Sequence, residues 1–529
     1  MQRCLLLVPV ALAALAAGCS LYAQCYLDAA ERDIQQILDA NRYQAVGKLQ
    51  EEAKFPKPEP KPEPAPKDKP PAAGAKEAPK PRVLSVQEAL RVATHNNRDF
   101  RSQIETLQLA ALSVSLQERN FGPILSNTIS YVFANSPSTA ATGTAAASVG
   151  VSQVLPTGGG VSASTGLSAV DDLEAGGSTT YRHDVTVSFS QPLLRGFGRE
   201  VAWEALTQAQ RDVIYALRDF ELFRQDFSID VLSSYYGILR QKQVVENSRR
   251  TYERFVFLRR RSEALFEIGR VSAIDKFRAK QEELTASNNL ITEEETLASL
   301  LDSFRVFLGL PEGVRIDVED VKPTAKQADI DLDSAVAAAL HNRLDLRTAE
   351  ERLEDADRGV RIARNGLLPD LDLDATFGLD GVRGAGWPNQ YEGSQSVGLS
   401  LVLPLDKVPD RNTYKRSLIT RSRRRRTLDL TRDNIRVGVM NTYRRLRRLA
   451  NSVQIQQANV DLAEKRVQNA QVLFEAGELG NRDVVEAESA KLSAQNALIR
   501  AILDYEIARL QLKRDIGILF IGPDGMWKE

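Results

Sequence analysis

Apolar side chains recur at intervals of three and four residues between residues 84 and 120, with Leu107 and Val114 among them. This period predicts an amphipathic α-helix, and Pro123 marks its end. Residues 126–132 then alternate between small polar and larger apolar side chains, which is the period of a half-buried β-strand. We therefore expect the folded part of the chain to begin with a helix followed by strands.

A much longer helical pattern follows Pro192. About sixty residues pass without proline, and a helix of that length spans roughly 90–100 Å. Val213, Leu217 and Phe220 lie on a narrow apolar stripe of the kind that forms the seam of a coiled coil. The stripe predicts a rod that turns near Gly269 and packs against other rods.

The same order of elements occurs again later in the chain. Six residues recur 246 positions later: Ala89, His95, Asn96, Asp99, Arg101 and Pro123 match Ala335, His341, Asn342, Asp345, Arg347 and Pro369. Four more recur 208 positions later: Gly269, Asp275, Leu284 and Gly309 match Gly477, Asp483, Leu492 and Gly517. The offsets differ by 38 residues, so the first copy carries an insertion of that size. Units of about 200 residues are too long for a solenoid repeat, and we interpret the pattern as a duplicated domain.

Most of the insertion lies in the strand region. The first copy has 69 positions between Pro123 and Pro192, whereas the second has 35 between Pro369 and Pro404. The extra residues predict two strands (146–154 and 160–168), a short turn (155–159) and two longer loops (134–145 and 170–179). Short turns at one end of a sheet and long loops at the other are typical of transmembrane barrels.

Composition narrows the functional classes. Of the 529 residues, 43% are apolar and only 6% are aromatic, which suits long helices better than several compact cores. The net charge is -1, and the densest basic run, residues 421–426, has no interleaved aromatic side chains. This pattern gives no indication of a nucleic acid as partner.

Catalytic chemistry has little support in the sequence. The histidines are His95, His183 and His341; no Cys or His pair has a metal-binding spacing, and no glycine-rich phosphate loop follows a strand. His95 and His341 occupy equivalent repeat positions, which favours a repeated structural role. We therefore expect no enzyme activity, no metal site and no cofactor.

The N-terminus has the features of an exported protein. Apolar residues from Leu5 to Ala17 form a run too short to cross a bilayer and typical of a signal peptide. Cys19 follows Gly18, as in the lipid-attachment box of bacterial lipoproteins; an ordinary signal peptide with an unrelated cysteine is the alternative. Residues 56–81 hold ten prolines interleaved with Lys and Glu, a composition typical of an extended tether.

With these features the chain resembles the TolC-type outer-membrane efflux and secretion factors over residues 84–518. The resemblance rests on the duplicated opening that ends in a proline before a strand, on the segment Gln191–Gly198, and on two Phe-x-x-Gly turns followed by Asp275 and Asp483. It implies a mixed fold, in which an α-helical coiled-coil tunnel joins a transmembrane β-barrel shared by a homotrimer. The barrel would have twelve strands, as in the family, or eighteen if the extra hairpin of the first repeat joins it.

The resemblance also implies partners and sites. Family members are passive conduits across the periplasm and the outer membrane, opened by a periplasmic adaptor that works with an inner-membrane transporter. The residues that match the adaptor-docking hairpin tips are Phe266, Gly269, Ser272, Asp275, Phe474, Gly477 and Asp483. Asp483 and Glu486, three residues apart on one helix face, match an acidic periplasmic gate, and Cys19 would carry the lipid anchor. Each tip residue could instead serve only the turn, and the acidic pair could be an ordinary solvated face.

The expected segments are a signal peptide (1–18), a lipid-anchored segment (19–53), a Pro- and Lys-rich linker (54–82), a first repeat (83–313), an inter-repeat linker (314–328), a second repeat (329–521) and a tail (522–529). Within the first repeat we expect strands at 124–192, a helical hairpin at 199–310 and its tip near 266–275. The corresponding ranges in the second repeat are 370–405, 411–518 and 474–483. The rival interpretation is a lipid-anchored periplasmic coiled-coil scaffold without a pore.

Overall fold

The computed structural model describes residues 27–42, 44–45, 82–136, 139–172, 179–320, 330–383, 390–476, 478–522 and 525–527. The predicted signal peptide, Cys19 and nearly all of the predicted linker at 54–82 lie outside these residues. Among the helices in the described ranges, none combines the length and the apolar composition needed to cross a bilayer.

The chain forms two compact units, and each combines segments of both repeats. One, which we call the sheet unit, comprises residues 1–45, 106–218 and 347–429; the other, the hairpin unit, comprises 46–105, 219–346 and 430–529. Four helices cross these limits and contribute to both units: α3 (Arg98–Phe121), α5 (Glu204–Glu267), α8 (Leu344–Asn365) and α9 (Val408–Ala476). The duplication therefore does not produce two separate domains.

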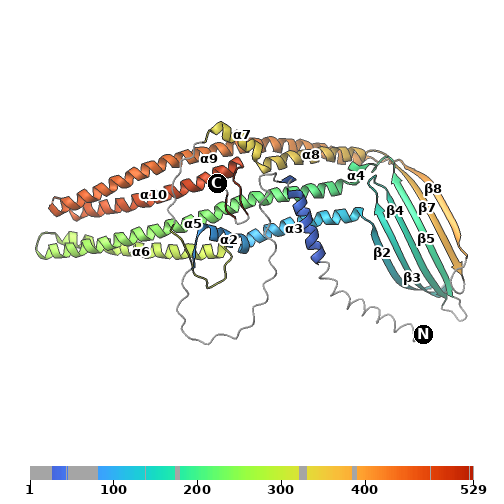
Figure 1. The fold of residues 1–529 in the computed structure, drawn as a ribbon, viewed down its shortest axis with the longest axis horizontal. Helices are drawn as coiled ribbons and strands as arrows, with labels where there is room; N and C mark the ends of the chain where they lie inside the picture. Colours follow the sequence, from blue (N-terminus) through green and yellow to red (C-terminus); the bar gives the residue numbers. More distant parts are fainter. Residues whose placement is uncertain are drawn as a thin grey trace, which may run out of the picture. The chain divides into compact units, whose positions relative to one another are not determined.

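The sheet unit contains a six-stranded antiparallel sheet in the order β2-β3-β4-β5-β7-β8 (Figure 1). The strands are β2 (Ile124–Ser136), β3 (Thr139–Val154), β4 (Gly160–Asp172), β5 (Thr179–Pro192), β7 (Asp370–Arg383) and β8 (Glu392–Val402). A short helix, α4 (Arg199–Ala202), follows the sheet and leads into α5. The extra hairpin, β3–β4, lies inside the sheet between β2 and β5, and β2 and β8 form the two edges.

The strands extend further than the sequence pattern predicted. β2 ends at Ser136 and β3 begins at Thr139, so the loop predicted at 134–145 was wrong. β4 ends at Asp172 and β5 begins at Thr179, which shortens the loop predicted at 170–179 as well. Small residues such as Ala, Gly and Ser have weak strand propensity of their own, and here the pairing with neighbouring strands holds them extended.

The register gives the sheet two chemically different faces. Ser126 pairs with Gly150, Gly150 with Ser164, and Ser164 with Thr186, so even-numbered residues lie opposite even-numbered ones. The β5–β7 and β7–β8 ladders keep the same rule. The even-numbered face, which we call the polar face, carries mostly Ser, Thr, Gly and Asp, whereas the odd-numbered apolar face carries mostly Ala, Val, Leu, Ile and aromatic residues.

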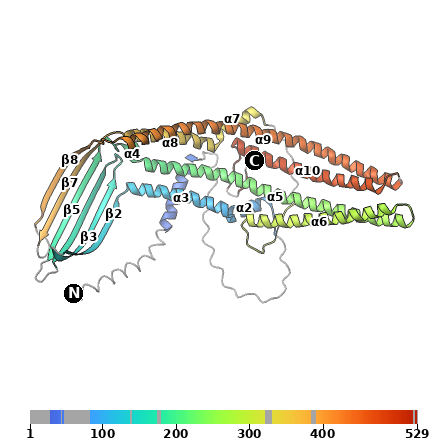
Figure 2. The same ribbon diagram turned by 180° about the vertical axis from the view of Figure 1, so that it is seen from behind.

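Two helical hairpins dominate the hairpin unit. The first pairs α5 with α6 (Ala273–Phe307) and the second pairs α9 with α10 (Asn481–Ile516); in each, the two helices run side by side (Figure 1, Figure 2). β1 (Arg82–Leu84) pairs in parallel with β6 (Ile316–Val318), which lies in the predicted inter-repeat linker. The short helices α2 (Val86–Asn96) and α7 (Leu332–Asn342) complete the unit.

Gly309 and Gly517 end the two returning helices in the same way. Both have a left-handed backbone, with φ of 70° and 79°. A side chain at Gly309 would come within 2.3 Å of the Asn96 carbonyl oxygen, and one at Gly517 within 3.0 Å of the Asn342 side chain. Asn96 and Asn342 are the last residues of α2 and α7. The matching Asn and Gly residues therefore form an equivalent packing contact in each repeat.

Candidate functional sites at the hairpin ends and between the long helices

The first hairpin end joins α5 to α6. Gly269 has φ of 75°, and its N–H group donates to the Phe266 carbonyl oxygen at 2.9 Å. The Ser272 hydroxyl oxygen accepts a hydrogen bond from the Asp275 N–H at 3.2 Å and so caps α6. Phe266 is partly exposed beside this turn, and the Lys276 ammonium lies 5.0 Å from the centre of its ring. The structure therefore brings together the four residues predicted at this tip.

The second hairpin end joins α9 to α10, and Gly477 lies outside the described residues. The Gly480 N–H donates to the Asp483 carboxylate at 3.2 Å, which stabilises the first turn of α10. The Arg261 guanidinium of α5 lies 4.9 Å from the centre of the Phe474 ring. Phe474 therefore contacts the first hairpin as well as its own.

An apolar cluster joins the two hairpins. It comprises Phe255, Leu258, Ala286, Val467, Ala470, Val484, Val485 and Ala487. Next along α10, Glu488 is only 3% exposed; its carboxylate pairs with Arg254 of α5 and accepts a hydrogen bond from Gln471 of α9 at 3.2 Å. Glu488 was not predicted, and a charged residue inside an apolar stripe is the signal that could have found it. The contact ties one repeat to the other through a buried charge.

The two residues predicted as a gate have separate partners. The carboxylate of Asp483 bonds to Gly480, whereas that of Glu486 accepts a hydrogen bond from the Arg466 guanidinium of α9 at 2.8 Å. The side chains of Arg466 and Glu486 are 53% and 57% exposed, and such pairs contribute about 0–1 kcal/mol. Arg466 thus offsets part of the negative charge at Glu486, and the gate assignment stays a prediction.

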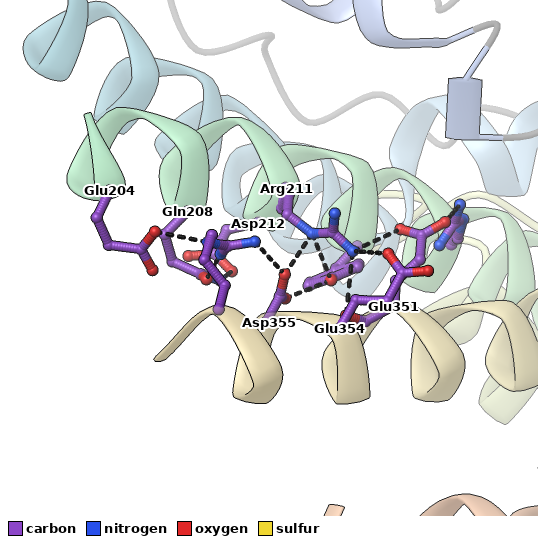
Figure 3. Close-up of polar contacts among 10 residues, drawn as sticks. Glu204, Gln208, Arg211, Asp212, Glu351, Glu354 and Asp355 are labelled. Atoms are coloured by element: carbon purple, nitrogen blue, oxygen red, sulfur yellow. Dashed lines mark hydrogen bonds and ion pairs between the residues drawn. The ribbon is translucent and has the colours of Figure 1, made fainter. Parts of the chain in front are cut away.

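In the sheet unit, a network of charged side chains ties α5 to α8 (Figure 3). Asp355 of α8 is its centre: the carboxylate pairs with Arg211 and accepts a hydrogen bond from the Tyr215 hydroxyl at 2.5 Å. The Arg358 guanidinium donates to the same carboxylate at 2.9 Å and to Glu204 at 2.5 Å. The network joins α5, a long helix of the first repeat, to α8 of the second repeat, and no sequence pattern predicted it.

A neighbouring residue extends this network to the N-terminal helix. Arg218, which is 3% exposed, pairs with Glu351 at 2.5 Å and donates to the Ala45 carbonyl oxygen at 3.1 Å. Ala45 ends the described N-terminal helical segment, so three stretches far apart in the sequence meet at one guanidinium.

Burial and the hydrogen bond to Asp355 raise the pKa of Tyr215 to about 12. For Arg211, burial works to lower the pKa, but the hydrogen bond with Tyr215 and the charge of Asp355 outweigh it, so its pKa is raised. The folded state therefore favours the neutral phenol. Its contribution to stability is present below the ordinary pKa of 10.0 and is lost as the pH rises towards 12.

The predicted lipid-attachment residue, Cys19, lies outside the described residues. Within the ranges that the structure describes, no group of three or more His, Cys, Asp or Glu side chains is arranged to hold a metal ion.

Comparisons with known proteins agree with this architecture. The family model described as outer membrane efflux protein matches residues 335–517. Outer membrane protein TolC of Escherichia coli strain K12 is 21% identical over 338 residues, which cover 60% of this chain and 66% of TolC, just under two thirds. Alkaline protease secretion protein AprF of Pseudomonas aeruginosa is 26% identical over 355 residues, covering 63% of this chain and 69% of AprF.

The chain is similar to the TolC-type outer membrane efflux proteins, and the family model covers its second repeat. Among solved structures, the outer membrane protein VceC of Vibrio cholerae matches the fold with a TM-score of 0.63 at 14% identity, over 82% of this chain and 96% of VceC. The predicted resemblance to this family is therefore confirmed, and the names of TolC and VceC place these two relatives in the outer membrane. The family consists of channel proteins rather than enzymes.

Replacing Asp355 by Asn tests the α5–α8 network. The change removes the negative charge shared by Arg211 and Arg358, and breaking a buried ion pair costs about 3–5 kcal/mol. Tyr215→Phe, the matched control, removes two hydrogen bonds, one to Asp355 and one from Arg211, at about 1 kcal/mol each. In thermal unfolding of the detergent-purified protein, followed by circular dichroism, we expect the midpoint to fall several degrees further for Asp355→Asn. Equal midpoints for the two variants would contradict the central position of Asp355.

Proposed function

We propose that the protein is the outer-membrane channel of a tripartite efflux pump or a type I-like secretion system. Three copies form a passive conduit, and a periplasmic adaptor opens it for an inner-membrane transporter. The names of AprF and TolC place these relatives in secretion and in the outer membrane.

The two-faced sheet is the observation that carries this proposal. On the apolar face, Ile129 is 88% exposed and Val397 is 77% exposed, an arrangement that is unfavourable in water. A lipid bilayer would give that face an apolar environment, while the polar face would line a water-filled passage. In a periplasmic scaffold without a pore, the apolar face of this sheet would stay exposed to water.

The edges of the sheet favour closure with further copies of the same chain. Within the described part of the chain, β2 and β8 each have only one neighbouring strand, and an unpaired backbone group inside a bilayer costs several kcal/mol. Strand direction alternates across the six strands, so β8 of one copy can meet β2 of the next in antiparallel orientation. Six strands from each of three copies would close one barrel of eighteen.

The hairpin ends supply the docking surface for the adaptor in this proposal. Beside the predicted tip residues, Ile268, Ile274 and Phe277 are 66%, 68% and 69% exposed. Three large apolar side chains exposed together at a turn favour contact with a partner over a purely structural turn. Lipid attachment at Cys19 would hold the N-terminus at the inner surface of the outer membrane.

Reconstitution in planar bilayers tests the channel. We expect single-channel conductance from purified trimers, partly blocked by trivalent cations that bind near Asp483 and Glu486. Asp483→Asn combined with Glu486→Gln should weaken the block, whereas Arg466→Ala should strengthen it, because Glu486 then loses its positive partner. Folded trimers that conduct at no voltage would refute the channel, and a block that neither variant changes would refute the gate assignment.

The buried pair of Arg254 and Glu488 tests whether the hairpins must separate for opening. Arg254→Ala leaves the Glu488 carboxylate buried without its partner, a penalty of about 3–5 kcal/mol that separation of the hairpins relieves. We expect the fraction of time spent open to rise by about tenfold or more. Arg249→Ala is the matched control, because its pair with Glu294 is exposed and lies within the first hairpin. Equal open times in the two variants would contradict this mechanism.

A further inference from the structure

A linking segment, residues 193–198, joins β5 to α4 and is fixed at the end of the sheet. Gly196 and Gly198 have φ of 82° and 104°, values that glycine adopts without strain. The Gly198 N–H donates to the Thr157 carbonyl oxygen at 3.0 Å. A side chain at Gly158 would come within 2.4 Å of the Gly196 carbonyl oxygen, so the turn between β3 and β4 fits closely against the linking segment.

This fixed segment exposes large apolar side chains. Phe197, between the two glycines, is 48% exposed, and Leu193 is 37% exposed. The Leu193 N–H donates to the Leu371 carbonyl oxygen at 2.7 Å and so continues the β5–β7 ladder, which puts Leu193 on the apolar face. Leu405, which follows β8, is 100% exposed. A rigid backbone that holds apolar side chains away from the protein favours a contact with an apolar partner.

The position of these side chains matches the thickness of a bilayer. Towards the other end of the apolar face, Tyr131 and Tyr181 are 69% and 39% exposed and lie in one row of the register. Tyr181 and Leu193 lie 12 positions apart along β5, which is about 40 Å of strand and about 30 Å across a bilayer at a tilt of about 40°. The hydrocarbon core of a bilayer is also about 30 Å thick. With the tyrosine row at one interface, the linking segment therefore lies at the other.

Two arginines without acidic partners lie beside this segment. Within the described part of the chain, the exposed guanidinium groups of Arg199 and Arg364 form no ion pair. Arg199 lies 4.4 Å from the centre of the Trp203 ring. Arg364 precedes Asn365, whose side-chain oxygen accepts a hydrogen bond from the Gly196 N–H at 2.8 Å. Both positive charges are thus next to the exposed apolar side chains.

Nearby carboxylates are already engaged. Glu200 pairs with Arg361, and the carboxylates of Asp370 and Asp410 lie 3.6 Å and 3.5 Å from the Arg195 guanidinium. The two unpaired arginines are therefore left for an anion from outside the chain. Beside an apolar surface the phosphate of a phospholipid fits best, because the acyl chains of the same molecule can cover the apolar side chains.

We propose that the linking segment and the end of α8 bind phospholipids of the periplasmic leaflet, preferentially anionic ones. Leu193 and Phe197 contact the acyl chains, while Arg199 and Arg364 contact the headgroup phosphates. The proposal rests on the membrane-spanning sheet of the proposed function. Each basic residue near an anionic membrane surface raises the affinity about fivefold. The contact sets the depth at which the sheet sits in the bilayer.

Tryptophan fluorescence in vesicles tests the depth. Phe197→Trp places an indole in the linking segment, and nitroxide-labelled lipids quench an indole that they contact. We expect the added emission to be quenched about twofold more by a label near the headgroup than by one near the end of the acyl chain. Phe277→Trp, the matched control, replaces an exposed Phe at the first hairpin end and should be quenched by neither. Leu405→Trp supplies a second position if Phe197→Trp does not fold.

Lipid preference tests the charge. Native mass spectrometry of trimers in mixed micelles compares bound phosphatidylglycerol with bound phosphatidylcholine. We expect Arg199→Gln combined with Arg364→Gln to lower the preference for phosphatidylglycerol about tenfold or more. Arg423→Gln combined with Arg425→Gln, the matched control, removes two exposed arginines further along α9 and should leave the preference unchanged.

The outcomes separate this proposal from the channel. Conducting trimers in which neither label quenches the added indole would overturn the lipid contact and leave the channel standing. An indole protected from both labels and from iodide would assign this surface to a second copy of the chain instead. An equal preference in the two arginine pairs, or displacement of the lipid by inorganic phosphate, would overturn the headgroup assignment. Folded trimers that conduct at no voltage refute the channel, whereas quenching by the shallow label in them still supports the lipid contact.

Discussion

Backbone pairing between neighbouring strands is the constraint on which the rest of this structure depends. Residues of one parity share a face in all six strands, so a slip of one residue in any ladder would move apolar side chains onto the polar face. Most side chains on the polar face are small and give little packing of their own. The ladders, together with the turn at Thr157 and Gly158, therefore hold the register, and the register in turn creates a surface suited to lipid on one side and to water on the other.

The two repeats keep the same residues at some packing contacts and differ at others. Gly309 and Gly517 make the same close contact in both copies. Glu488 has no such counterpart: the matching position is Lys280, which pairs with Glu283 inside its own hairpin at 3.2 Å. The buried carboxylate of this link thus comes from the second repeat only, whereas the extra strand pair comes from the first.

Much of this architecture could be predicted from the sequence, because its signals are local. A proline before a strand, a glycine with a left-handed backbone at Gly269 and a long apolar stripe each act within a few residues. The full length of β3 could not be predicted, because its first residues have weak strand propensity and are held extended by pairing with β2 and β4. The pairing of Arg254 with Glu488 also had to come from the structure, since these residues are 234 positions apart and meet only where the two hairpins pack together. The pairing of Arg466 with Glu486 depends on how the consecutive helices α9 and α10 face each other.

The central claim is that six strands from each copy form one closed wall through the edges β2 and β8. Electron cryo-microscopy of the trimer in lipid nanodiscs tests it most directly, because individual strands can be counted and traced. The account predicts eighteen strands, with β8 of each copy beside β2 of the next. A twelve-stranded wall with β3 and β4 outside it, or a sheet whose edges remain unpaired in lipid, would contradict it.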